Sequence, residues 1–191
     1  MDLFYLAISA TFVNNILLAQ YLGHCPFLGV SKRLGTAIGM AAAIIFVTIL
    51  SAIFTWIVFT FVLRPYGLEF LQTLTFILII ASLVQLVEII LKKKSKALYN
   101  ALGVYLALIT TNCAVMGVAL LVARKELAFV EMLVFASASA LGYAVALLLF
   151  AGHRERLQIS AIPQSMQGTA IALVTAGIMS LAFIGFKGMA G

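Results

Sequence analysis

The chain alternates long apolar runs with short polar connections. Apolar runs of about 18 residues or more recur along most of its length, and an α-helix needs about that length to cross a bilayer. The pattern predicts six transmembrane helices, at 3–22, 35–63, 70–91, 98–123, 127–150 and 169–186. The expected fold class is an all-α integral membrane protein, built as a single membrane domain over residues 1–191.

Two stretches of the chain align when the sequence is offset by 88 residues. Leu18–Val30 (LAQYLGHCPFLGV) then matches Leu106–Val118 (LALITTNCAVMGV), with five identities in 13 positions. The identities include Cys25 and Cys113, the only two cysteines of the protein. The same offset carries the second predicted helix onto the fifth, and the third roughly onto the sixth.

Three helices in each copy would insert the copies in opposite orientations. We therefore expect a 3+3 inverted-topology repeat, with halves at about 1–91 and 96–191. In such repeats the special residues meet near the bilayer midplane, often on broken helices. The first and fourth helices are the ones expected to break.

The first break is expected at or near Cys25, because two features of the sequence disfavour a helix there. Gly23 and Gly29 weaken a regular helix, and Pro26 pushes the residue before it out of the α region. The second break is expected beside Cys113. There Thr110, Thr111 and Asn112 can satisfy backbone groups that a break leaves free.

Charge is sparse, at 9% of residues, and its placement carries more information than the net value of +6. Soluble domains carry about a quarter charged residues. The much lower charge content of this chain indicates that lipid surrounds most of it. The positive net charge is therefore not interpreted as a sign of nucleic-acid binding. Eight of the twelve Lys and Arg residues follow the first, third or fifth predicted helix. These are Lys32, Arg33, Lys92, Lys93, Lys94, Lys96, Arg154 and Arg156. The positive-inside rule places them in the cytoplasm and both termini on the outer side.

Three polar residues within the apolar runs are candidates for an ion path. Asn14 and Asn15 need partners at membrane depth, so they either bond to a neighbouring helix or line a path. Glu88 is either a buried ion site or one member of an interfacial pair with Lys92, four residues on.

The two deep cysteines leave three chemical interpretations open, since the chain has no CxxC or zinc-type spacing. In the first, they supply half of the ligands of an iron–sulfur cluster, and a second protein supplies the other thiolates. In the second, they cycle between dithiol and disulfide as a membrane electron carrier. In the third, the protein is a transporter with broken helices and the cysteines are incidental.

Two longer stretches carry a family resemblance: GHCPFLGVSKRLGTAIGM at 23–40 and LITTNCAVMGVALL at 108–121. They resemble the A-type subunits of Rnf complexes, a family of ion-translocating oxidoreductase membrane subunits. The E-type subunits of the sodium-pumping NADH:quinone reductase are related to that family. The likeness runs over nearly the whole chain. One departure is Ala107, where the family leads us to expect a proline.

The resemblance implies a non-flavin subunit of a complex in the bacterial cytoplasmic membrane. That complex couples electron transfer between reduced ferredoxin and NAD to translocation of Na⁺ or H⁺. The implied partners are a homologous membrane subunit of opposite topology, of the Rnf E type, and subunits of the B, C, D and G types.

The resemblance also implies a [2Fe–2S] cluster shared with that homologous subunit. Cys25 and Cys113 match the family's ligand positions. Residues around the sulfurs are expected to tune the potential of the cluster; they are Gly29, Thr110, Thr111, Asn112 and Gly117.

Overall fold

The computed structural model describes residues 3–31, 34–94, 105–159 and 167–189, and in these residues every regular element is helical. The N-terminal elements are α1 (Leu3–Ile8), the π-helical turn η1 (Ser9–Val13) and α2 (His24–Val30). They are followed by α3 (Leu34–Val58), η2 (Phe59–Leu63), α4 (Arg64–Tyr66), η3 (Glu69–Leu71) and α5 (Gln72–Lys94). The C-terminal elements are α7 (Tyr105–Thr110), α8 (Cys113–Arg124), α9 (Phe129–Ile159) and α10 (Thr169–Met189).

Three of the described helices are long and apolar enough to cross a membrane. They span Leu34–Tyr66, Gln72–Ile90 and Phe129–Leu157. Shorter apolar helices lie at Leu3–Val13, Leu108–Arg124 and Thr169–Gly185. The prediction of an all-helical membrane protein is confirmed, while the six-helix 3+3 repeat stays a prediction.

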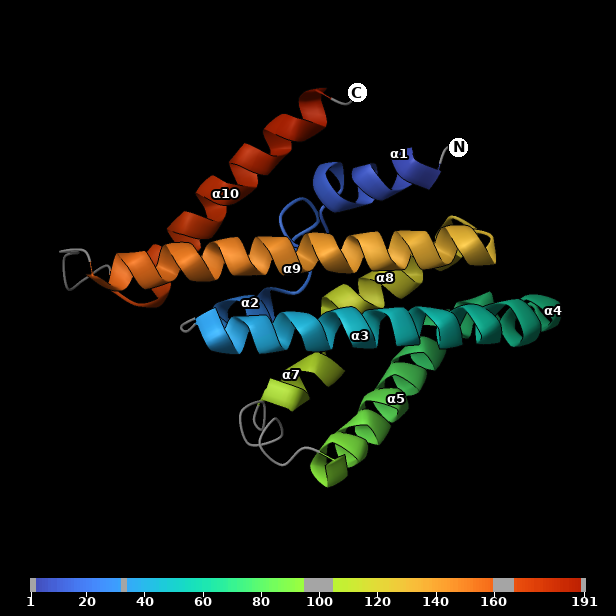
Figure 1. Ribbon diagram of the computed structural model, residues 1–191. Helices are drawn as coiled ribbons and strands as arrows, with labels where there is room; N and C mark the ends of the chain where they lie inside the picture. The colour runs from blue at the N-terminus through green and yellow to red at the C-terminus, as the bar shows by residue number, and fades with distance from the viewer. Residues whose placement is uncertain (1–2, 32–33, 95–104, 160–166, 190–191) are drawn as a thin grey trace.

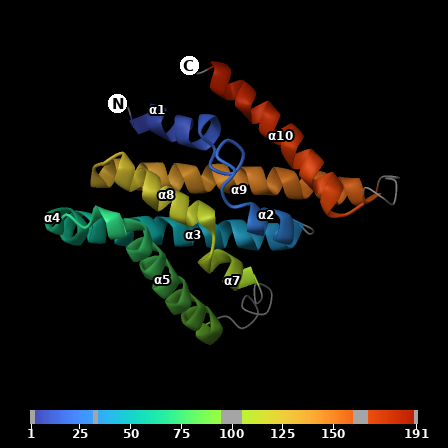
Figure 2. The same cartoon turned by 180° about the vertical axis from the view of Figure 1, so that it is seen from behind.

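The long helices α3 and α9 form the centre of the molecule, where they lie side by side and run in opposite directions (Figures 1 and 2). Helices α1 and α10 lie on one side of this pair and contact α9 or η1. Helices α5 and α7 lie on the other side and contact α3. Helix α8 packs against α3, α5 and α9, so the segment that begins with Cys113 is enclosed by three helices.

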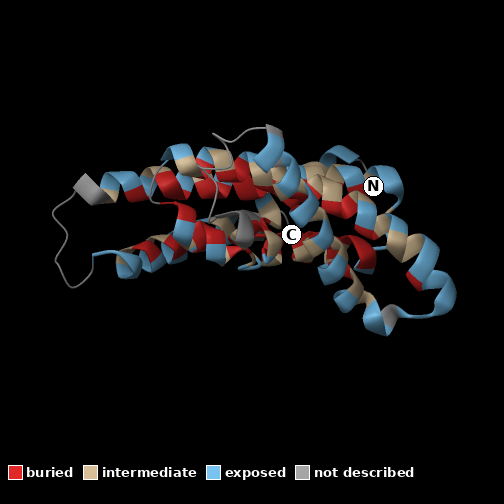
Figure 3. Cartoon of the chain, turned by 90° about the horizontal axis from the view of Figure 1, so that it is seen from below, coloured by how far each residue is buried: buried red, intermediate tan, exposed pale blue. Residues whose placement is uncertain are grey.

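Figure 3 shows buried residues in red and exposed residues in pale blue, and many helices carry both colours. Tyr143, Leu147 and Phe150 of α9 are almost completely buried. Helix α5 is the opposite case, because large apolar side chains such as Leu74 and Leu78 are about two-thirds exposed, at 66% and 67%. Apolar surface of this kind is covered by lipid or by another membrane protein.

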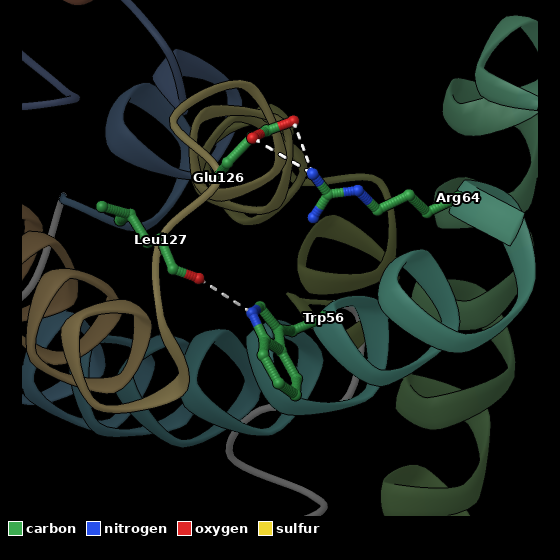
Figure 4. A network of polar contacts seen from close by, with 4 residues as sticks. All are labelled: Trp56, Arg64, Glu126 and Leu127. Carbon is green, nitrogen blue, oxygen red and sulfur yellow. Dashed lines mark hydrogen bonds and ion pairs between the residues drawn. The ribbon is translucent and has the colours of Figure 1, made fainter.

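Polar contacts fix the far end of α3 against the turn between α8 and α9 (Figure 4). The indole N–H of Trp56 donates to the carbonyl oxygen of Leu127 over 3.0 Å. Arg64 pairs with the carboxylate of Glu126 at 3.4 Å. Both side chains of the ion pair are more than half exposed, so the pair contributes little to stability.

The first helix is much shorter than predicted, and this is the main correction to the expected fold. It ends at Val13, and the chain from Asn14 to Gly23 is not helical. The side-chain oxygen of Asn15 accepts hydrogen bonds from the N–H groups of Leu17 and Leu18. An asparagine that binds nearby backbone N–H groups in this way competes with the helix and ends it.

The break expected at or near Cys25 ends at Gly23, two residues before the cysteine. Cys25 is the second residue of α2 and has a helical backbone, although Pro26 follows it. Pro26 lies in the first turn of α2, where its missing N–H leaves no intrahelical bond unmade. The left-handed backbone of Gly23, with φ of 88°, ends the irregular segment and begins α2.

The fifth predicted helix extends nine residues beyond its expected end at Phe150. Helix α9 continues to Ile159 and therefore includes Arg154 and Arg156, which were expected in a loop. Arg154 is buried and bonded inside the molecule, which stabilises this extension. Lys32, Arg33, Lys96 and the expected start of the fourth helix at Leu98 lie outside the described residues.

Candidate functional site

Cys113 is the first residue of α8, and Asn112 is the N-cap of that helix. The backbone of Asn112 is extended, with φ of −71° and ψ of 112°, and its Oδ1 accepts from the N–H of Ala114 over 2.9 Å. A side-chain oxygen in this position satisfies an N–H group that the first helical turn leaves free. The sulfur of Cys113 is therefore presented at a capped helix start, in a half-buried position.

Gly23 connects the two cysteine segments directly. Its N–H donates to Sγ of Cys113, with an N···S distance of 2.9 Å. Its carbonyl oxygen accepts from the hydroxyl of Tyr143 over 3.0 Å. Cys25 follows only two residues later, so this bond brings the neighbourhoods of both sulfurs together from positions that are 90 residues apart.

The close packing around Gly23 leaves no space for a side chain. A Cβ at this position would lie 2.6 Å from Cε2 of Tyr143 and 3.0 Å from Cβ of Ala114. Together with the positive φ, this makes glycine the residue type that fits. The hydrogen bond to Cys113 is therefore built into the backbone of this segment.

Three contacts with α9 hold the Cys25 segment in place. Tyr143 binds the carbonyl before α2, and Phe150 stacks on Phe27 with ring centroids 3.9 Å apart. Arg154 donates from one nitrogen to the carbonyl oxygen of Leu28 at 2.7 Å and to Oγ of Ser31 at 2.9 Å. A guanidinium at the carboxyl end of a helix interacts favourably with the partial negative charge of that end. Start, middle and end of α2 are thus each fixed to the same helix.

Asn15 joins the irregular segment to α9 through both ends of its amide. Its Nδ2 donates to the carbonyl oxygens of Thr11 and Gly142, while its Oδ1 accepts from the backbone as described above. Asn14 is only half-buried and donates to Oγ of Ser9 at 3.4 Å. Of the two asparagines, Asn15 therefore has the larger role in holding the segment together.

The other expected site residues lie on three parts of the chain: the turn before Cys113, α8 and α2. Thr110 ends α7, and Thr111 and Asn112 form the turn before Cys113. Gly117 is buried one turn into α8, with Leu22 packed against it. Gly29 is exposed near the end of α2, close to Leu108.

Glu88 lies on a different element from the cysteines. It is half-buried near the end of α5, a helix that contacts α3, α7 and α8. Its place as an ion site rests on the sequence pattern alone.

The donor set of this chain fits one side of a shared iron–sulfur cluster. Among the described residues no group of three or more His, Cys, Asp or Glu side chains could hold a metal ion, and the two thiols are free. Cluster ligation takes four thiolates as a rule. Cys25 is exposed on the surface of the chain, where another protein can approach, and Cys113 already accepts an N–H···S bond of the kind that stabilises a thiolate ligand.

Sequence reasoning did not find Gly23, Tyr143 or Arg154 as parts of this site. Gly23 was recognised only as a residue that disfavours a helix. Tyr143 lies 120 residues from its partner and Arg154 lies 126 residues from Leu28. A contact over such a separation leaves no periodic signal in one sequence, so only the folded chain reveals it.

Comparison with known proteins gives a match to a family and to several relatives. The family is described as Rnf-Nqr subunit, membrane protein, and it matches residues 3–190. A protein of Acetobacterium woodii, named as the A-type subunit of a Na(+)-translocating ferredoxin:NAD(+) oxidoreductase complex, is 55% identical over 189 residues, covering 99% of this chain and 98% of that protein. Proteins of Syntrophotalea carbinolica and Ectopseudomonas mendocina, both named as the A-type subunit of an ion-translocating oxidoreductase complex, are 50% identical and cover 98% of this chain and 97% of their own lengths.

Proposed function

Because this chain belongs to the Rnf-Nqr family of membrane subunits, we propose that it serves as the A-type subunit of an ion-translocating Rnf oxidoreductase complex. The family match over nearly the whole chain supports this assignment, and so do relatives that carry this subunit name at 50–55% identity. The chain is an electron-transport subunit of that translocase.

The reaction we assign to the complex is electron transfer between reduced ferredoxin and NAD, coupled to movement of Na⁺ or H⁺. The name of the Acetobacterium woodii relative states a Na⁺-translocating ferredoxin:NAD⁺ complex, and the other names state only an ion. Asn14, Asn15 and Glu88 are the candidates for the ion path. The partners we propose are subunits of the B, C, D, E and G types, and the flavins and the sites for ferredoxin and NAD lie on subunits other than this chain.

Within this complex, Cys25 and Cys113 supply half of the ligands of a [2Fe–2S] cluster, and a homologous subunit of opposite topology supplies the rest. A bound cluster would provide one-electron transfer across the middle of the membrane. The observation that carries this proposal is the hydrogen bond from Gly23 N–H to Cys113 Sγ, because it joins the two cysteine segments. Exposure of Cys25 leaves room for the homologous subunit.

The topology we propose is the 3+3 inverted repeat in the bacterial cytoplasmic membrane, with both termini outside. Two features support it. Cys25 and Cys113 each lie in the first turn of a short helix, α2 and α8, at the offset of 88 residues. The corresponding long helices α3 and α9 run in opposite directions (Figure 1).

A thiol–disulfide carrier is the alternative function for the same two cysteines. It is not favoured, because the relatives are named as subunits of ion-translocating complexes and not as carriers that act alone. The two functions differ in what Cys25 and Cys113 bind, so one experiment separates them.

The test compares the purified complex with complexes that carry Cys25→Ser or Cys113→Ser. We expect both variants to assemble with the other subunits but to lose the iron and the electron paramagnetic resonance signal of the shared cluster. Met116→Leu, a half-buried change one turn along α8, is the control for altered packing. Full iron content in both serine variants would contradict the cluster, and a Cys25–Cys113 disulfide trapped in the isolated chain would support the carrier.

A further inference from the structure

Tyr143 is a buried residue on α9 whose hydroxyl is committed to the cysteine site. Its side chain is 2% exposed, and a buried hydroxyl requires a hydrogen-bond partner. The hydroxyl donates to the carbonyl oxygen of Gly23, at 3.0 Å, and also interacts with the side chain of Asn112. The same glycine donates its N–H to Cys113 Sγ at 2.9 Å, so one residue links the tyrosine to the sulfur.

The segment that contains Gly23 needs such a restraint, because the chain from Asn14 to Gly23 has no helical hydrogen-bond ladder to hold it. Leu22 donates its N–H to the carbonyl of Ile16, and Tyr21, directly before Leu22, has a left-handed backbone with φ of 56°. The edge of the Tyr143 ring also lies against Gly23, where a Cβ would be 2.6 Å from Cε2. Ring and hydroxyl together fix the position of Gly23 and therefore the direction of its N–H.

Hydrogen bonds to a ligating sulfur withdraw electron density from it, and this stabilises the reduced form of an iron–sulfur centre. We propose that Tyr143 is a positioning residue that holds the Gly23 N–H against the sulfur of Cys113 and thereby raises the reduction potential of the cluster. This inference rests on the proposed function, since it takes Cys113 to be a ligand. Tyr143 itself neither ligates iron nor carries electrons.

The experiment is a redox titration of the purified complex, read by the electron paramagnetic resonance signal of the cluster. Tyr143→Phe keeps the ring and removes only the hydroxyl, so we expect unchanged iron content and a midpoint potential shifted to a more negative value. Tyr66→Phe is the matched control, because Tyr66 is exposed at the end of α4 and should leave the potential unchanged.

A second variant covers the case in which Tyr143→Phe does not assemble. Incorporation of 3-fluorotyrosine at position 143 keeps the ring and the hydroxyl, places one fluorine on the carbon next to the hydroxyl and makes the hydroxyl a stronger donor, so the potential should shift in the positive direction. Wild-type complex without cluster iron would contradict the proposed function itself. Normal iron with an unshifted potential in the variants that assemble would overturn the role of Tyr143 and leave the proposed function standing.

Discussion

Asn15 and Gly142 are joined by a hydrogen bond of 2.9 Å from the side-chain nitrogen of the asparagine to the backbone carbonyl of the glycine. The bond connects the irregular N-terminal segment with the middle of α9. Gly142 makes the approach possible, since a Cβ there would lie 2.7 Å from the carbonyl oxygen of Thr11. Asparagine and glycine thus act as one joint between α9 and the end of η1.

The joint predicts that Asn15→Ala destabilises the protein. The substitution leaves buried backbone groups at Leu17, Leu18 and Gly142 without the amide that now binds them. At about 1–3 kcal/mol for each unsatisfied buried group, partly relieved by relaxation, we expect a loss of about 2–4 kcal/mol. Thermal inactivation of the detergent-purified complex measures it.

Asn14→Ala is the control for this prediction, because Asn14 is half-buried and its bond to Ser9 is long at 3.4 Å. It should cost less than about 1 kcal/mol. If Asn15→Ala instead kept full thermal stability and lost the dependence of activity on Na⁺ or pH, Asn15 would be part of an ion path and not a structural brace.

We expect Gly142→Ala and Gly117→Ala to differ in how much they lower the stability of the complex, although both glycines are buried. The added methyl at 142 meets the backbone of Thr11, which cannot move away, so overpacking should cost about 1–3 kcal/mol. The methyl at 117 meets a terminal methyl of Leu22 at 2.6 Å, and this side chain can rotate. We expect only the first variant to lower the thermal midpoint of the complex clearly; equal effects at both sites would contradict the backbone contact.

Gly23→Ala should disturb the cysteine site more than either of those two substitutions. A left-handed backbone costs a residue with a side chain roughly 1–2 kcal/mol, and the new methyl overlaps the ring of Tyr143 and approaches Ala114. The expected result is a complex with less cluster iron, measured by metal analysis. Gly35→Ala is the control, because nothing lies within 4 Å of its Cβ position; iron content that is the same in both variants would show that Gly23 is not essential.

We expect Arg154→Met to weaken the attachment of α2 to α9. Arg154 is buried, and the variant loses its bonds to the Leu28 carbonyl and to Ser31 while keeping an apolar stem of similar length. Hydrogen bonds from a charged donor contribute about 1.5–3 kcal/mol each, so the loss of both bonds is expected to cost about 3–6 kcal/mol of stability. In complex prepared without cluster iron, alkylation of Cys25 should also become faster.

Arg64→Met is the matched arginine control for that experiment. Its ion pair with Glu126 is exposed and long at 3.4 Å, so its removal should change stability by about 0.2–1 kcal/mol. If Arg154→Met and Arg64→Met lowered stability by the same amount and left Cys25 equally reactive, the proposed role of Arg154 would be refuted.

The sequence was sufficient for the class of fold and for the position of three long apolar helices. Hydropathy placed α3, α5 and α10 within a few residues of their observed bounds, because their apolar length is decided locally. It also singled out Asn112 beside Cys113, since an N-cap is a local device that uses its own side chain.

Two errors have a common cause, which is that tertiary contacts decided the backbone. The first helix ends at Val13 because the amide of Asn15 binds both its own segment and Gly142, which is 127 residues away. Helix α9 continues past Phe150 because Arg154 is occupied by the end of α2. Hydropathy and local propensity report only on neighbouring residues, so they give no information on these two long-range contacts. The errors could therefore not be avoided from the sequence pattern.

The attachment of α2 to α9 has a consequence for how the protein is made. Synthesis delivers Gly23 and Leu28 to the bilayer more than a hundred residues before Tyr143 and Arg154 exist to receive them. Until α9 has been inserted, the Cys25 segment lacks the contacts with α9 that hold it in place. If the chain shares a cluster as we propose, the cluster would have to be loaded after translation of the last third of the chain, late in the assembly of the protein.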